Sequence, residues 1–93
     1  MKLLIPLLEQ NRDEIAQLYV KEQGKTLAEA YGEIDKSIAF IDYMTSLSMS
    51  NKGEVLQNSV ENEIIQLTKK PIGVTAGIVP WNAPIMVLMR KVI

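Results

Sequence analysis

The sequence predicts an α/β fragment with two or three N-terminal helices, then a β-hairpin, then a strand, a loop and a helix. Two observations indicate this fold class. Apolar residues recur at helical spacing up to about Gly53, and after it apolar and polar residues alternate as they do in strands. Residues 72–93 then combine an apolar β-branched run with an apolar helical pattern, which is the first half of a strand–helix–strand unit.

The same changes of pattern divide the chain into three parts. Residues 1–53 are expected to be helical, residues 54–71 to form the paired strands, and residues 72–93 to form the strand, loop and final helix. A parallel strand pair needs a second strand after the connecting helix, and none follows here. We therefore expect the sequence to be an internal piece of a larger protein.

The helical part contains local start and stop signals. A first helix is expected from about Leu3, with Pro6 in its first turn, where a missing N–H costs little. Asn11, with Glu14 three residues later, is predicted to cap a second helix. Gly24 then supplies a C-terminal stop.

A longer helix is predicted from Leu27 to about Met49. Thr26 and Glu29 have the spacing of a capping box, in which each side chain satisfies a free amide at the helix start. The helix carries an apolar stripe at i, i+3, i+4 and i+7 steps: Leu27, Ala30, Tyr31, Ile34, Ile38 and Ile41. This stripe is the main candidate for the core.

The remaining elements are shorter. Glu54–Gln57 and Glu63–Lys70 are predicted strands of the hairpin, and Pro71 ends the second. Ile72–Val79 reads as a strand covered on both faces. Residues 84–93 are predicted to be a helix that begins at Pro84 and, being apolar nearly all round, is buried.

Composition excludes several kinds of chemistry. The 93 residues include no cysteine and no histidine, so the chain has no disulfide, no thiolate nucleophile, no imidazole base and no ordinary zinc site, and no metal is expected. The net charge of −1 predicts no nucleic-acid partner. No segment reads as a membrane span or an export signal, so no membrane association and a cytoplasmic location are expected.

The strongest candidate for a functional site is the loop Pro80-Trp81-Asn82-Ala83-Pro84. It joins a predicted strand to a helix N-terminus, which is where open α/β sheets bind ligands. Two prolines stiffen it, so the Asn82 amide would be a preset donor for an oxyanion. From position alone, the alternative is favoured that Asn82 caps the helix and Trp81 is a packing anchor.

These residues also carry a resemblance to a known family. PIGVTAGIVPWNAP, followed by Arg90 and Lys91, resembles the segment that enters the NAD-binding domain of the aldehyde dehydrogenase superfamily. KEQGKTLAEA is similar to that family's turn between two N-terminal helices, and ENEIIQLTKKPIGV resembles its oligomerisation strands. IDYM, GEVLQ and the Arg-Lys pair resemble the lactaldehyde and glycolaldehyde dehydrogenases. The resemblance implies that residues 72–93 open a Rossmann-like NAD-binding domain.

The resemblance also implies a role for each residue of the loop and helix. Asn82 would donate to the thiohemiacetal oxygen in the oxyanion hole, and Lys91 would lie near a proton relay. Arg90 would face oxygen atoms of the substrate. The residues that would border NAD are Val79, Pro80 and Trp81. Without the resemblance, Arg90 and Lys91 would read as a solvated or salt-bridged helix face.

Two departures from the family limit what this chain is expected to do. The family's cysteine nucleophile is missing, and so is the later segment with its general-base glutamate. We therefore expect a truncated aldehyde dehydrogenase that is inactive by itself. The complete protein would oxidise an aldehyde to the acid with NAD, or with NADP, as a homodimer or homotetramer. The alternative is a non-catalytic helical module that binds a partner.

Overall fold

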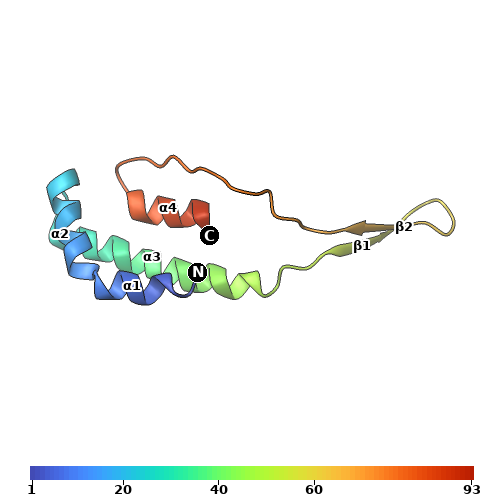
Figure 1. The fold of residues 1–93 in the computed structure, drawn as a ribbon, viewed down its shortest axis with the longest axis horizontal. Helices are drawn as coiled ribbons and strands as arrows, with labels where there is room; N and C mark the ends of the chain where they lie inside the picture. Colours follow the sequence, from blue (N-terminus) through green and yellow to red (C-terminus); the bar gives the residue numbers. More distant parts are fainter.

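A computed structural model describes residues 1–93 and contains helices at both ends of the chain with two short strands between them (Figure 1). The elements in chain order are α1 (Leu4–Gln10), α2 (Arg12–Gln23), α3 (Leu27–Ser48), β1 (Glu54–Gln57), β2 (Ile64–Leu67) and α4 (Pro84–Val92). The order and type of these elements match the predicted α/β fragment, except for the strand expected over Ile72–Val79.

The molecule is elongated because the hairpin projects away from the helices (Figure 1). Its extents are 64 × 23 × 20 Å and its radius of gyration is 19.1 Å. A compact chain of this length would have a radius of gyration of about 12 Å. Only 8 of the 93 residues are buried, and none of them lies in the hairpin or in the segment that follows it.

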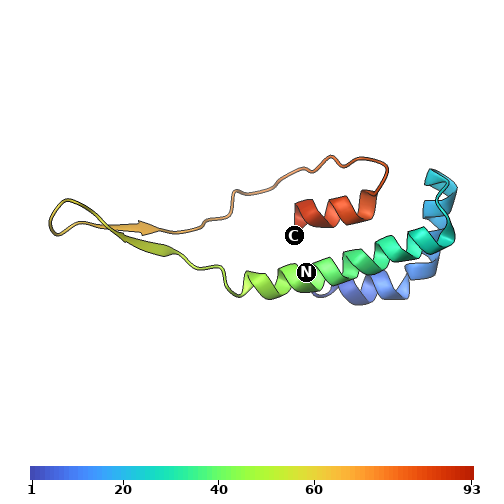
Figure 2. The same ribbon diagram turned by 180° about the vertical axis from the view of Figure 1, so that it is seen from behind.

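The core lies where α2 and α4 meet the long helix α3. Figures 1 and 2 both show α4 lying alongside α3, with α2 packed at the end of α3 where that helix begins. The buried cluster consists of Ala16 and Tyr19 from α2 and Ala30 and Ile34 from α3. Ile85 of α4 packs against it, so a residue near the end of the chain completes the N-terminal core.

The capping box predicted at the start of α3 is confirmed. The Thr26 hydroxyl accepts from the Glu29 amide at 3.3 Å, and the Thr26 amide donates to the Glu29 carboxylate at 2.9 Å. The Thr26 amide and hydroxyl lower the pKa of the Glu29 carboxyl by stabilising its charged form. Gly24 ends α2 in the left-handed conformation, with φ of 70°, as its position indicated.

Asn11 is the N-cap residue of α2, as predicted, but the side-chain capping bond expected there is not formed. The Asn11 side chain does not cap α2 but donates from Nδ2 to the Leu7 carbonyl at 2.8 Å. The physical reason is that α1 ends directly before α2 begins, so Asn11 belongs to both termini. Its one amide group satisfies a carbonyl at the end of the first helix instead of an amide at the start of the second.

The hairpin pairs β1 and β2 antiparallel, with Glu54 opposite Leu67 and Gln57 opposite Ile64. The second strand is shorter than the predicted Glu63–Lys70, and all residues of both strands are exposed. Gly53 is needed at the open end of the hairpin, because a Cβ there would lie 2.6 Å from the Leu67 carbonyl oxygen.

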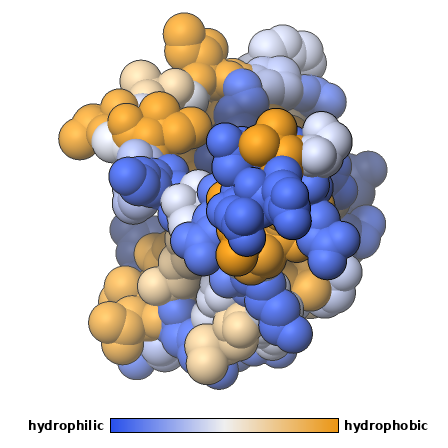
Figure 3. All heavy atoms as spheres, turned by 90° about the vertical axis from the view of Figure 1, so that its right-hand side faces the viewer, coloured by the Kyte–Doolittle hydropathy of each residue, from blue (hydrophilic) through white to orange (hydrophobic).

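The strand predicted over Ile72–Val79 is not formed. This segment is extended and unpaired, and Ile72, Val74 and Ile78 are 90% exposed or more. The only sheet in the chain is the β1–β2 pair, so no neighbouring strand is present to bond its amides and carbonyls. Viewed from the hairpin end, hydrophobic residues lie at the surface beside hydrophilic ones (Figure 3).

The final helix is confirmed, but its burial is not. Among its residues only Met89 is buried, and Val92 is 50% exposed. The reason is that α4 packs mainly on α3 and touches α2 only at its start, through Ile85, so only one side of a helix that is apolar nearly all round is covered. None of the four helices combines the length and the apolar character that a bilayer crossing requires.

Candidate functional site

The predicted loop lies at the end of the molecule where α2, α3 and α4 meet (Figure 1). Trp81 is 77% exposed and Asn82 is also exposed, while Val79 and Ala83 are half-buried. The N-cap residue of α4 is Ala83, and no side chain caps the helix there. The helix-cap interpretation of Asn82 and the packing-anchor interpretation of Trp81 are therefore both wrong, and the Asn82 amide is open to solvent.

The first backbone amides of α4 are hydrogen-bonded by side chains that lie far away in the sequence. Pro84 is the first helical residue and has no N–H, so the first amides that need acceptors are those of Ile85 and Met86. The Ile85 amide donates to the Tyr19 hydroxyl at 2.8 Å, and the Met86 amide donates to Glu33 Oε1 at 3.4 Å. Residues of α2 and α3 thus supply the acceptors that a local cap would normally provide.

Tyr19, Glu33 and Lys25 form one connected polar cluster beneath the loop. The Tyr19 hydroxyl donates to Glu33 Oε1 at 2.6 Å, and Lys25 Nζ donates to Glu33 Oε2 at 2.6 Å. Tyr19 is 4% exposed and Glu33 is 7% exposed. Both carboxylate oxygens therefore have donors, which is the condition for burying a charge without a large penalty.

The cluster shifts two pKa values. Burial alone would raise the pKa of the Glu33 carboxyl, but the hydrogen bonds from Lys25, Tyr19 and a backbone amide outweigh it and hold this pKa below its usual value. Burial and the hydrogen bond to Glu33 raise the pKa of the Tyr19 hydroxyl. The carboxylate is therefore charged and the phenol protonated at neutral pH, which matches the directions of their hydrogen bonds.

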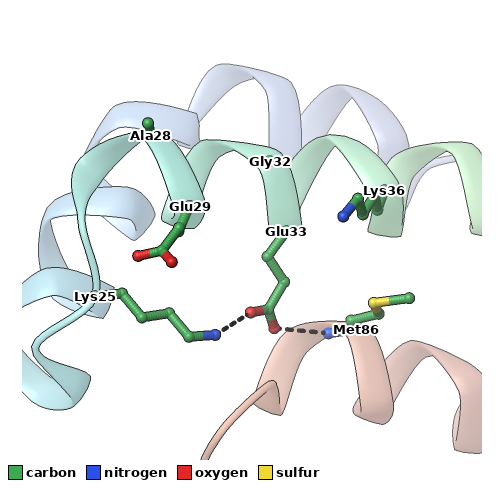
Figure 4. Close-up of a pocket in the computed structure, with 7 residues that line it drawn as sticks. All are labelled: Lys25, Ala28, Glu29, Gly32, Glu33, Lys36 and Met86. Carbon is green, nitrogen blue, oxygen red and sulfur yellow. Dashed lines mark hydrogen bonds and ion pairs between the residues drawn. The ribbon is translucent and has the colours of Figure 1, made fainter.

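An open pocket of about 510 Å³ lies beside this cluster (Figure 4). In Figure 4 the Lys25 and Glu33 side chains point toward each other, and Glu33 also reaches the amide at the start of α4. The lining residues are Lys25, Ala28, Glu29, Gly32, Glu33, Lys36 and Met86. None of the six residues predicted from the sequence as site residues lines it.

Arg90 and Lys91 lie at the other end of α4 from Asn82. Arg90 is six residues along the helix from Pro84, a rise of about 9 Å. Its guanidinium carbon is 5.9 Å from the centre of the Phe40 ring on α3. Lys91 Nζ donates to the Ile78 carbonyl and so touches the extended segment just before Val79. The structure thus brings Lys91 near the predicted cofactor-bordering residues but keeps Arg90 apart from Asn82.

Comparison with known proteins identifies the family. The model of the aldehyde dehydrogenase family matches residues 1–93. The chain belongs to the aldehyde dehydrogenase family. Its relatives include 3-sulfolactaldehyde dehydrogenase of Pseudomonas putida, which is 37% identical over 92% of this chain. Succinate-semialdehyde dehydrogenase of Escherichia coli, the NADP(+) form, is 38% identical over 91% of this chain.

A solved structure shares the fold. The structure of 3,6-anhydro-L-galactose dehydrogenase in complex with NAP superposes with a TM-score of 0.86 at 34% identity, and the match covers 97% of this chain. It covers only 19% of that chain. Likewise the present chain spans 18% of the length of each of the two curated relatives. These matches confirm the family resemblance seen in the sequence. They also show that the chain spans under a fifth of the length of these relatives.

The aldehydes in the relatives' names differ from those the sequence suggested. They include 3-sulfolactaldehyde, glutarate semialdehyde and succinate semialdehyde, rather than lactaldehyde or glycolaldehyde. The comparisons therefore establish the family of this chain, and the aldehydes in the relatives' names differ from one another.

The residues that sequence reasoning missed are Tyr19, Lys25 and Glu33. A signal for Glu33 was present in the sequence, because this charged residue lies within the apolar stripe of α3, between the buried residues Ala30 and Ile34. A charge at a stripe position predicts a buried partner. The identity of that partner could not be read from the sequence, since Tyr19 is on another helix.

Proposed function

We propose that this chain is the segment of an NAD(P)-dependent aldehyde dehydrogenase that supplies the oxyanion donor and borders the nicotinamide cofactor. The supporting observation is the exposed Pro-Trp-Asn loop, in which the Asn82 amide is not used as a helix cap. The cysteine nucleophile and the glutamate base would lie outside this chain, which contains no cysteine.

The chemistry asked of Asn82 is electrostatic. When a thiolate attacks an aldehyde, negative charge develops on the former carbonyl oxygen, and a donor that is already aimed at that oxygen stabilises it without reorganisation. An amide N–H suits this role because it donates without itself giving up a proton at neutral pH. Two prolines that flank the Trp-Asn pair restrict the backbone and so limit the positions that the amide can adopt.

The residues before Asn82 are suited to hold a dinucleotide. Val79, Pro80 and Trp81 combine an exposed indole ring with backbone groups that no strand partner occupies. Such an apolar surface with free backbone donors and acceptors fits a nicotinamide ring and its ribose. The cofactor, when bound, would accept the hydride that leaves the substrate. In the longer protein Ile72–Val79 would become the first strand of a Rossmann-like sheet.

The substrate we propose is a short aldehyde with a polar oxygen substituent, such as lactaldehyde or glycolaldehyde. Arg90 is exposed and positively charged, and its long side chain would have to turn from Phe40 toward the loop to bind this substituent. Lys91 would contribute to proton relay near the cofactor. We further propose that the exposed β1–β2 hairpin contacts a second subunit, because both faces and one edge of each strand are uncovered.

The decisive experiment is a segment exchange. Residues 1–93 replace the matching segment of the Escherichia coli succinate-semialdehyde dehydrogenase, and NADPH formation is measured with several aldehydes. We expect an active chimera in which Asn82→Ala lowers kcat by about 10²–10³-fold, the usual cost of removing one oxyanion donor. Asn51→Ala, which removes an exposed asparagine beyond the end of α3, is the matched control. Full activity of the Asn82→Ala chimera contradicts the proposal.

The isolated chain provides a second test. Because it has no cysteine, we expect no aldehyde-dependent reduction of NAD or NADP by the purified 93-residue protein. The absorbance of the reduced nicotinamide reports the outcome directly. Turnover by the isolated chain would show that the proposed division of catalytic residues is wrong.

A further inference from the structure

The start of α4 has an unusual arrangement of hydrogen bonds. A helix usually satisfies its first amides with the side chain of the residue before it, but Ala83 cannot do this. The two amides that need acceptors, at Ile85 and Met86, are instead bonded by residues 66 and 53 positions earlier in the chain. The position of this helix start therefore depends on tertiary contacts.

The acceptors themselves are rigidly held. Tyr19 and Glu33 are both buried, and the Tyr19 hydroxyl links them by donating to Glu33 while accepting from Ile85. Lys25 bonds the second oxygen of the same carboxylate. A negative carboxylate at a helix N-terminus is also favoured by the helix dipole. Each polar group of the cluster has a fixed partner, so the cluster has one preferred geometry.

We propose that Tyr19 and Glu33 are positioning residues that act through the first turn of α4 to hold Asn82 in place, an inference that rests on the proposed function of Asn82. Asn82 lies two residues before Pro84. Because this proline restricts its own backbone and that of Ala83, the orientation of α4 limits the orientations that the loop can adopt. Removing the remote acceptors would free the helix start and with it the amide that faces the oxyanion.

Nuclear magnetic resonance on the 93-residue chain tests the first step. In Tyr19→Phe, which removes only the hydroxyl, we expect hydrogen exchange of the Ile85 amide to accelerate about tenfold. The ¹⁵N order parameter of the Asn82 backbone amide should fall from near 0.85, typical of rigid backbone, toward about 0.6. Tyr31→Phe is the matched control, because the Tyr31 hydroxyl donates to Asp13 of α2 and bonds no residue of α4.

Two results overturn this step. One is an unchanged Ile85 exchange rate and Asn82 order parameter in a folded Tyr19→Phe chain, and the other is an unprotected Ile85 amide in the parent chain. If the Tyr19→Phe chain loses its helical circular dichroism and is therefore unfolded, the Glu33→Gln chain is measured in its place. Glutamine keeps an acceptor oxygen and removes only the charge. We expect Met86 exchange to rise a few-fold in Glu33→Gln, and no rise overturns the proposal.

A double-mutant cycle in the segment-exchange chimera tests whether the cluster acts through Asn82. We expect Tyr19→Phe to lower kcat with little change in KM, and to lower it no further when Asn82→Ala is already present. A merely structural role would make the two effects additive, and additive effects overturn the inference. The resonance measurements do not depend on activity, so loss of the proposed function and loss of the positioning role are distinguishable.

Discussion

The helical end of this molecule and its hairpin end differ in where their partners lie. In the helical end, apolar residues far apart in sequence cover one another, as Tyr19, Ile34 and Ile85 do. In the hairpin and the segment that follows, residues of similar hydrophobicity such as Ile72 and Val74 are almost fully exposed. The difference shows that hydrophobicity alone does not bury a residue. A strand also needs a neighbour for its backbone, and this chain supplies one only to β1 and β2.

The largest difference between the two ends is expected when one isoleucine in each is replaced by alanine and the free energy of unfolding is measured. Ile34→Ala removes a fully buried side chain and should lower the free energy of unfolding by about 2–5 kcal/mol. Ile72→Ala removes a side chain that is 95% exposed and should change it by less than about 0.5 kcal/mol. Urea unfolding followed by helical circular dichroism measures both. Equal effects would show that the two ends are buried alike.

Acid should weaken the helical end through Glu33. The pKa of this carboxyl is lower in the folded state than its usual value, so its stabilising contribution is present above about pH 4.3 and is lost as the pH falls through the folded-state pKa. We expect a loss on the order of 1 kcal/mol from this group. Unfolding curves from pH 7 to pH 3 report it, and Glu33→Gln should flatten the dependence. An unchanged slope in Glu33→Gln would assign the acid sensitivity to other carboxylates.

The smallest effect is expected at the hairpin. Gly53→Ala places a Cβ against the Leu67 carbonyl oxygen and should speed amide exchange in β1 and β2. Because the hairpin buries nothing against the helices, the free energy of unfolding of the helical end should change by less than about 0.5 kcal/mol. Gly32→Ala, inside α3 with open space around it, is the contrasting replacement: it should raise the free energy of unfolding of the helical end by about 1 kcal/mol and leave exchange in the hairpin unchanged. A large change of this free energy in Gly53→Ala would indicate that the two ends are coupled.

Local signals predicted the helices well and the strands less well. The Thr26–Glu29 box, the Gly24 stop and Pro84 at the start of α4 each act within four residues, and each is confirmed. The failures at Asn11 and at Ile72–Val79 have one cause in common. The Asn11 side chain could bond either helix end and bonds the Leu7 carbonyl, whereas Ile72–Val79 has no neighbouring strand to pair with. In both cases the outcome depends on which groups lie close in space.

The candidate site shows the same limit. The Pro-Trp-Asn loop could be found in the sequence because its residue types are specific, and its Asn82 remains our proposed oxyanion donor. The Tyr19–Glu33 cluster could not be found, because its members lie on separate helices and meet α4 only in the folded chain. The contacts of Lys91 with the Ile78 carbonyl and of Arg90 with Phe40 likewise form only in the folded chain.

The amino-acid sequence by itself determined the helix boundaries, the position of the hairpin and the family, since these depend on residue spacing and on motifs a few residues long. The tertiary structure decided which of the apolar segments are covered and which side chains hold the start of α4. The reason is that burial and hydrogen bonding are satisfied by whatever group lies close in space, and closeness between residues 19, 33 and 85 is created only by folding.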